Sequence, residues 1–154
     1  MFGAAELGAV AGVLHDLGKY TLPFQERLRG SPARVDHSTW GARIAAERLG
    51  IPGQLLAYGI AGHHAGLANG RGEGERTALA DRIAAEDLPT LDVAWEGDIT
   101  LPNKLSFPAG FKHYGQEKQQ AKDRQPFQLA MLARMLFSCL VDADFIDTER
   151  FYLQ

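Results

Sequence analysis

The stretch AAELGAVAGVLHDLGK, residues 4–19, indicates how the chain begins to fold. Residues 4–14 are rich in Ala, Leu and Val and carry Glu6 as their only charge, which predicts a buried helix. Gly18 is of the residue type that commonly ends a helix. The adjacent His15 and Asp16 therefore lie at a helix end, where one short stretch of backbone offers an imidazole nitrogen and a carboxylate oxygen.

Apolar periodicity and boundary residues predict further helices along the chain. We expect them over about residues 37–49, 52–64 and 76–86, and from 116 or 126 to 146. Pro23 and the Gly-Ser-Pro of residues 30–32 indicate an irregular stretch after the first helix. Residues 65–75 contain four glycines and predict a mobile loop. Residues 87–115 carry three prolines, three glycines and no sustained periodicity, so we expect a long irregular surface insertion there.

These elements predict an all-α protein, a compact helical bundle in which residues 1–154 form a single domain. Cys139 is the only cysteine, which excludes a disulfide framework and a thiolate zinc site. No apolar run approaches the roughly 18–20 residues of a membrane span, and the start of the chain lacks the features of a signal peptide. We therefore expect a cytoplasmic protein with no membrane partner. The net charge of −3 argues against a generic attraction to nucleic acid, so such a substrate would have to be held locally.

Four of the five histidines lie beside predicted helix ends or turns. These are His15, His37, His63 and His64, whereas His113 falls in the insertion and is expected to be a surface residue. Imidazole nitrogens together with carboxylate oxygens suit a divalent ion such as Fe, Mn, Co, Ni or Zn. Side chains of His63 and His64 diverge by about 100° around a helix, which lets them approach one ion from different sides if the helix frays there.

A further carboxylate ligand is expected from the last helix, which offers Asp142 and Asp144. Apolar residues form a stripe along this helix at spacings of three and four, namely Leu129, Leu132, Ala133, Leu136, Phe137 and Leu140. Asp144 continues the stripe and Asp142 points away from it. A carboxylate at the end of a core-facing stripe must be paired or bound to metal, so we favour Asp144 and keep Asp142 as the alternative.

Each of these features also has an ordinary structural explanation. A His-Asp dipeptide is common, His63 and His64 can form a solvated helix end, and His37 can cap a helix. Asp144 can simply pair with Arg134 or Arg150. It is the joint occurrence of the four histidines with Asp16 and a late aspartate that indicates a site.

The same segments resemble the HD nuclease domain of CRISPR-associated type I nuclease–helicases, within the HD phosphohydrolase superfamily. The order and spacing of the motifs agree over roughly residues 10–67 and 127–150. The matching segments are HDLGK at 15–19 with FQ at 24–25, DHSTWGA at 36–42, IAGHHAG at 60–66 and LVDADFIDTE at 140–149.

This resemblance implies a nuclease that degrades single-stranded DNA in antiviral interference, in the company of a superfamily-2 helicase and a CRISPR effector complex. It also implies one or two divalent transition-metal ions. Asp16 would bridge them, His37, His63 and His64 would serve one, and His15 and Asp144 the other. Asp16 and Lys19 would be the catalytic residues, with Lys19 near the scissile phosphate.

One feature of the family has no counterpart, because no histidine precedes His15 and the family usually supplies one from an upstream helix. We expect either a truncated start or a longer protein whose first helix is not included. The missing histidine would affect binding of the ion at His15 and Asp144.

Two other functions remain open at this point. One is an HD-type phosphohydrolase that acts on nucleotides or cyclic nucleotides, which would need an enclosed pocket. The other is an inactive HD-like module, which the missing histidine favours. A nucleic-acid substrate could be held by basic residues near the motifs, and the candidates are Arg27, Arg29, Arg34, Arg71 and Arg76.

Overall fold

The computed structural model of the chain describes residues 3–69, 78–109, 111 and 119–153, with side chains in the last range described from residue 124 onward. Helices account for all of its regular structure in the described ranges, apart from an isolated antiparallel bridge between Thr21 and Leu91. The all-α fold is thus confirmed. In chain order the elements are α1 (Ala5–Leu14), the 3-10 turn η1 (Leu17–Tyr20), α2 (Leu22–Leu28), α3 (Thr39–Arg48), α4 (Gly50–Gly62), α5 (Leu79–Ala84), α6 (Trp95–Asp98) and α7 (Gln119–Tyr152).

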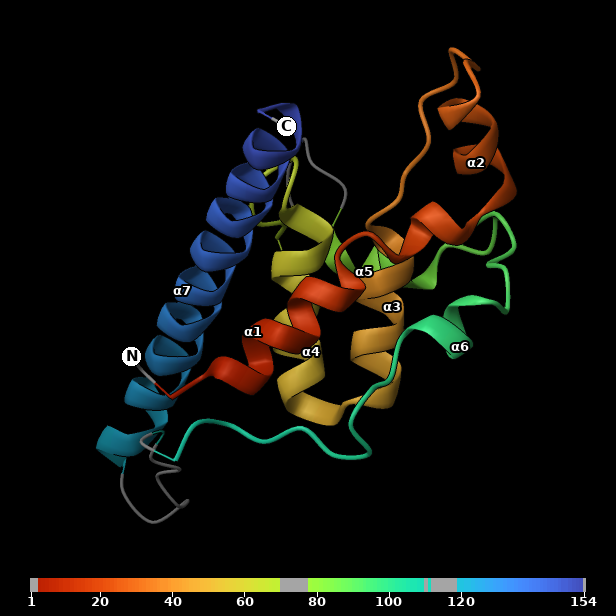
Figure 1. Cartoon of the computed structure of the whole chain (residues 1–154). Coiled ribbons are helices and arrows are strands. Elements are labelled where there is room, and N and C mark those ends of the chain that lie inside the picture. The colour runs from red at the N-terminus through yellow and green to blue at the C-terminus, as the bar shows by residue number, and fades with distance from the viewer. Residues whose placement is uncertain (1–2, 70–77, 110, 112–118, 154) are drawn as a thin grey trace.

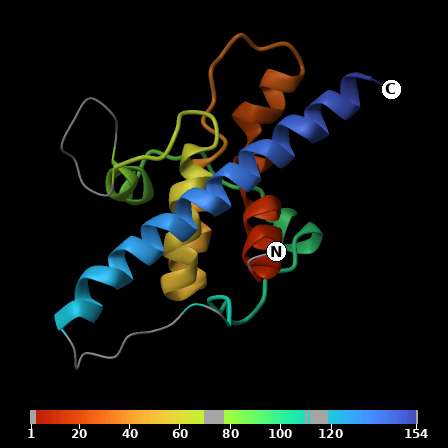
Figure 2. The same ribbon diagram turned by 90° about the vertical axis from the view of Figure 1, so that its left-hand side faces the viewer.

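The long helix α7 crosses α1 and α4 on one side of the bundle, and its C-terminal end projects beyond them (Figures 1 and 2). Its apolar stripe is what holds it there, because Leu132, Leu136 and Leu140 are buried at spacings of four residues. The next turn along this face carries Asp144. The packing of α7 therefore decides where that carboxylate lies.

The end of α1 packs closely against α3, and the contact depends on Gly41. A Cβ atom at Gly41 would lie 1.8 Å from the carbonyl oxygen of Leu14. Only glycine permits this approach without a shift of the backbone. The last turn of α1, from which His15 and Asp16 follow, is thereby set against the first turn of α3.

Most of the expected helices are present, with shifted ends. The stretch after α1 was expected to be irregular around Pro23 and residues 30–32. This is wrong at Pro23, because α2 forms there, whereas residues 30–32 are irregular as expected. Pro23 lies in the first turn of α2, where a missing N–H removes no helical hydrogen bond. Helix α5 is shorter than expected, with residues 76 and 77 outside the described part, and α7 continues past residue 146 to Tyr152. Of the expected glycine-rich loop, residues 65–69 are described and are not helical.

The described part of the 87–115 insertion is irregular except for α6, as expected. It is not wholly a surface segment, because Trp95 and Leu105 are only 5% and 4% exposed and belong to the core. Within the described ranges, no helix combines the length and the apolar character needed to cross a membrane.

Candidate metal centre

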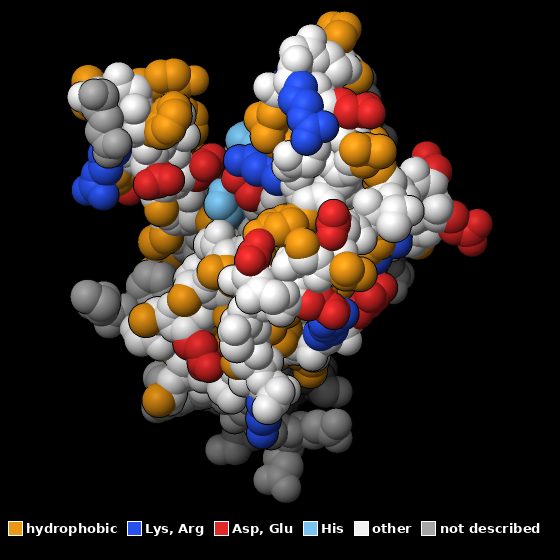
Figure 3. All heavy atoms as spheres, turned by 45° about the vertical axis from the view of Figure 1, so that its right-hand side comes forward, with side chains coloured by type: hydrophobic (Ala, Val, Ile, Leu, Met, Phe, Trp, Pro, Cys, Tyr) orange, Lys and Arg blue, Asp and Glu red, His pale blue; other side chains and the backbone are white. Residues whose placement is uncertain are grey.

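Three helix ends and one helix face bring the predicted ligands together. His15 directly follows α1, and Asp16 comes next before η1. His37 precedes α3, and His63 directly follows α4, with His64 as the next residue in the sequence. In the space-filling view, histidine side chains lie in a hollow between the C-terminal end of α7 and the part of the surface formed by α2 and the loop after it (Figure 3).

Gly18 draws the His-Asp turn onto the segment that carries His37. Its backbone N–H donates a hydrogen bond to the carbonyl oxygen of His37 at 2.8 Å. A Cβ atom at this position would lie 2.5 Å from the Cα atom of His37. A glycine is therefore required here by close approach of two backbones, and that approach sets Asp16 beside His37.

The two carboxylate oxygens of Asp16 face different histidines. Oδ1 lies 3.5 Å from Nε2 of His37 and 3.8 Å from Nε2 of His63. Oδ2 lies 3.2 Å from Nε2 of His15. The same His15 nitrogen is 3.6 Å from Oδ1 of Asp144. A carboxylate in this position can contact two neighbouring ions through separate oxygens.

Among the described residues, two groups of side chains are close enough to hold an ion, since the ligand atoms in each lie within 4.8 Å of one another. The structure thus brings together six of the seven predicted metal-site residues. The first group is Asp16, His37, His63 and His64, and the second is His15, His63 and Asp144. Asp142 belongs to neither group and is exposed on another side of α7.

The histidines offer the correct ring nitrogen to an ion. Nδ1–H of His63 donates to the carbonyl oxygen of Ile60 at 2.7 Å, and Nδ1–H of His15 donates to that of Gly12 at the same distance. In His63 this bond leaves Nε2 with a lone pair directed at the cluster. In His15, Nε2 lies beside Oδ2 of Asp16 and would have to give up its proton to bind an ion. Nε2 of His63 is buried and has no hydrogen-bond partner among the described residues. A buried polar atom without a partner is costly, and a divalent ion would satisfy it.

Burial keeps two of the imidazoles in the neutral form that binds metals. It lowers the pKa of His63 to about 4 and also lowers the pKa of His37. Burial acts in the same direction on His15, but the hydrogen bond and charge of Asp16 outweigh it and raise the pKa of that ring. For Asp16, burial favours a higher pKa, yet His15 and Lys19 outweigh it and hold the pKa of the carboxyl well below its ordinary range. Asp16 is therefore an anion at neutral pH.

Lys19 stands beside the cluster with its charge accessible. Its Nζ atom lies 2.5 Å from Oδ2 of Asp16, and its side chain is 46% exposed. Arg27, Arg29 and Arg34 are exposed on α2 and the following loop, and none of them forms an ion pair within the described part of the chain. Arg71, Arg76 and His113 lie outside the described residues.

One residue near the centre was missed by the sequence analysis. Arg82, in α5, donates hydrogen bonds to Asp36, Ser38 and Thr39 in front of and at the start of α3. Its partners are remote in sequence, so no local pattern indicates the pairing.

The comparison with known families agrees with the resemblance at the superfamily level. The protein-family model described as HD domain matches residues 3–92, which cover more than half of the chain and include all the first-group residues together with His15. No curated protein matches the chain.

Proposed function

This chain belongs to the HD domain family, whose members are metal-dependent hydrolases of phosphoester bonds, and on that basis we propose that it is a nuclease that degrades single-stranded DNA. The observation that carries the proposal is the position of the histidine–aspartate cluster in an open hollow (Figure 3). A polymer can cross such a hollow, whereas an enzyme for free nucleotides needs a pocket that encloses its substrate.

The donor set fits one or two divalent ions. Asp16, His37, His63 and His64 would hold one, and His15 and Asp144 would contribute to a second with Asp16 between them. A bound divalent ion supplies a coordinated water of lowered pKa and positive charge for the phosphate.

The protein's own residues orient and neutralise the substrate. Asp16 stays anionic and is held in place from one side by Lys19 and from the other by the histidines. The ammonium group of Lys19 is a compact charge that can turn from Asp16 toward a phosphate oxygen of the strand. His63 keeps its ring orientation through the bond to Ile60, so its Nε2 atom stays directed at the ligand cluster.

Affinity for the strand would come from the wall formed by α2 and its loop. Arg27, Arg29 and Arg34 are exposed there, and Lys and Arg side chains are visible on this side of the hollow (Figure 3). Such contacts neutralise phosphates and make binding depend on salt concentration. These arginines would supply a local attraction to DNA, which the net charge of −3 does not provide for the chain as a whole.

We further propose that a superfamily-2 helicase, within or beside the same protein, delivers the strand as part of a CRISPR effector. The segments that resemble the CRISPR-associated nucleases support this context, in particular the Phe24-Gln25 and His63-His64 elements.

The test is a comparison of substrates in the presence of Mn²⁺ or Co²⁺. Single-stranded DNA, double-stranded DNA, nucleoside triphosphates and cyclic nucleotides are each incubated with the wild-type chain and with Asp16→Asn. We expect cleavage of single-stranded DNA that is lost in Asp16→Asn. Cleavage confined to a nucleotide would favour the small-molecule phosphohydrolase, and absence of all cleavage from a metal-loaded protein would favour an inactive module.

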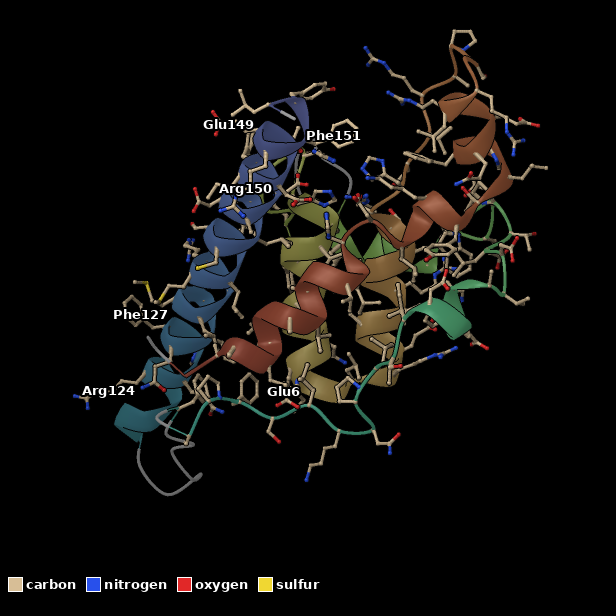
Figure 4. All side chains as sticks on the ribbon, viewed as in Figure 1. Glu6, Arg124, Phe127, Glu149, Arg150 and Phe151 are labelled. Carbon is tan, nitrogen blue, oxygen red and sulfur yellow. The ribbon has the colours of Figure 1, made fainter. Side chains whose placement is uncertain are left out.

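The proposed basic wall has its own test. The double variant Arg27→Glu with Arg34→Glu should bind single-stranded DNA more weakly and with a smaller dependence on salt. Arg124→Glu is the matched control, because Arg124 is exposed near the other end of α7 (Figure 4). Equal affinity of the double variant and the wild type would exclude this wall as the binding surface.

A further inference from the structure

Arg82 ties together the two segments that carry most of the first ligand group. Its Nη2 atom donates to Oδ2 of Asp36 at 2.9 Å and to Oγ of Ser38 at 2.8 Å, on either side of His37. Its Nη1 atom donates to the carbonyl oxygen of Ala61, in the last turn of α4 and two residues before His63. One guanidinium group thus spans the approach to α3 and the end of α4.

The first of these segments is the turn over residues 36–39, which several hydrogen bonds hold together. Oδ1 of Asp36 accepts hydrogen bonds from the backbone N–H groups of Ser38 at 2.8 Å and Thr39 at 3.1 Å. Asp36 therefore caps the N-terminal end of α3 with its side chain, although Ser38 and not Asp36 occupies the N-cap position. Burial favours a higher pKa for Asp36, but the bonds from Thr39 and Ser38 and the charge of Arg82 hold that pKa well below its ordinary range. His37 lies between Asp36 and Ser38, inside this turn.

The second segment is a helix end, where carbonyl groups lack partners within the helix. The contact from Arg82 satisfies the carbonyl of Ala61 and fixes the last turn of α4. From that turn the chain continues through Gly62 to His63, whose Nδ1–H is held by Ile60. The contact therefore acts on the part of α4 from which the ligand histidines emerge.

The hydrogen bonds of the Arg82 side chain are not explained by a need to attach α5 to the bundle, because other residues also hold this helix. Helix α5 is also held by buried Leu79 and by Arg43 of α3, which donates to the carbonyl oxygen of Ala85. Within the described part of the chain, every hydrogen bond that the Arg82 side chain donates ends on one of the two ligand-bearing segments. The Arg82 side chain is only 18% exposed, so its geometry is restricted by packing as well.

We propose that Arg82 is a positioning residue of the metal centre, which sets the distance between His37 and His63 without contacting an ion. The proposal rests on the proposed function in that it concerns the same metal site. The planar guanidinium is required because it donates in three directions from a fixed fork, which an ammonium group cannot reproduce. Residues that orient metal ligands typically change affinity by about 10- to 100-fold when they are replaced.

The experiment compares the full chain with Arg82→Gln, Arg82→Lys and Arg43→Gln. Arg43→Gln is the matched control, because Arg43 also holds α5, and among the described residues its side chain donates its hydrogen bond to Ala85 and not to either ligand-bearing segment. Co²⁺ affinity is measured by titration calorimetry, the visible absorption of bound Co²⁺ reports the coordination geometry, and thermal unfolding with a chelator reports stability.

We expect Arg82→Gln to bind Co²⁺ about 10- to 100-fold more weakly, with an altered Co²⁺ spectrum, and Arg82→Lys to lie between it and the wild type. Arg43→Gln should keep the affinity and spectrum of the wild type even where its stability falls. Wild-type affinity and spectrum in Arg82→Gln would overturn the proposal. If Arg82→Gln does not fold, the comparison of Arg82→Lys with Arg43→Gln decides in the same way.

A measurement without metal separates this proposal from the proposed function. Ring resonances of the histidines are compared by NMR in the metal-free wild type and Arg82→Lys. We expect changes at His37 and His63, and unchanged His37 and His63 resonances would overturn the positioning role. Absence of Co²⁺ binding by the wild type would instead remove the proposed metal-dependent activity, while the NMR comparison still tests Arg82.

Discussion

Nε2 of His15 lies 3.6 Å from Oδ1 of Asp144, although the two residues lie near opposite ends of the chain. The contact forms because α7 lays its buried leucines on α1 and α4, and Asp144 follows Leu140 on the same face. It joins the HD turn to the last helix. Helical geometry also explains why Asp144 reaches the cluster and Asp142 does not, because only Asp144 lies on the packed face of α7.

Replacement of Asp144 should affect metal content where replacement of Asp142 does not. We expect Asp144→Asn to lose the ion of the second group or to bind it at least about 10-fold more weakly. Asp142→Asn is the control, because Asp142 is exposed and belongs to neither ligand group. Elemental analysis of both variants after equilibration with Mn²⁺ provides the measurement. Equal loss of metal in the two variants would speak against a ligand role for Asp144.

The two ligand groups should release their ions at different pH values. Protons compete with metal ions for imidazole nitrogen. Burial lowers the pKa of His63 to about 4 and lowers that of His37, so these two ligands of the first group stay deprotonated in mild acid. On His15 burial acts likewise, but Asp16 outweighs it and raises the pKa above 6.5. As pH falls, His15 is therefore protonated before His37 and His63.

We accordingly expect the ion of the second group to dissociate at higher pH than the ion of the first. Metal content measured after dialysis at a series of pH values from 8 to 5 tests this order. Dissociation of the first-group ion at a higher pH than the second-group ion would contradict this order.

Gly18→Ala should disturb the centre by a steric route. The added Cβ atom would lie 2.5 Å from Cα of His37, and backbone atoms on both sides would have to shift. Overpacking of this kind costs about 1–3 kcal/mol of unfolding free energy, and the shift should also weaken metal binding. Chemical denaturation and metal titration are the measurements.

Gly8→Ala serves as the control for that variant. Gly8 lies within α1, and a Cβ atom there would meet nothing within 4 Å. Alanine is preferred to glycine inside a helix by roughly 0.5–1 kcal/mol, so this variant should be more stable than the wild type. A Gly18→Ala protein as stable as Gly8→Ala would show that the backbones are not in the close contact described.

Phe151 should contribute to binding of a single strand. It follows Asp144 by two helical turns on the same face of α7, and its side chain is 74% exposed. Stacking of a base on an exposed aromatic ring is worth about 1–3 kcal/mol. We therefore expect Phe151→Ala, made in an Asp16→Asn background to prevent cleavage, to bind a labelled oligonucleotide more weakly by that amount in fluorescence anisotropy.

Phe127→Ala is the matched control, because Phe127 is 71% exposed near the opposite end of α7 (Figure 4). It should bind the oligonucleotide as the parent does. A loss that is the same in both variants would indicate a general effect on α7 rather than a contact with the strand.

Much of the centre could be predicted from the sequence because its residues occur in short segments beside helix ends. The apolar stripe of α7 was enough to favour Asp144, which the structure brings to the cluster, over Asp142. The helices around the centre could be predicted for the same reason, since periodicity and Gly or Pro boundaries act locally.

The parts that could not be predicted depend on contacts between remote segments. Arg82 is an ordinary residue of a short helix until the fold pairs it with Asp36. Trp95 and Leu105 are buried although the segment around them has no periodicity, because a loop can fill a core without repeating. Pro23 was interpreted as a break, whereas it lies in the first turn of α2. The polar run of residues 147–150 interrupts the apolar stripe of α7, so the stripe does not indicate that the helix continues to Tyr152.

The most direct test of the account is a calorimetric titration of Mn²⁺ into the chelator-treated wild-type chain and into Asp16→Asn, with metal content determined in parallel. Because the fold gathers candidate ligands around Asp16, we expect one or two ions to bind per wild-type chain. In Asp16→Asn we expect ions to be lost or to bind at least about 10-fold more weakly. A wild-type chain that binds no ion, or a variant that binds Mn²⁺ as the wild type does, would contradict the account.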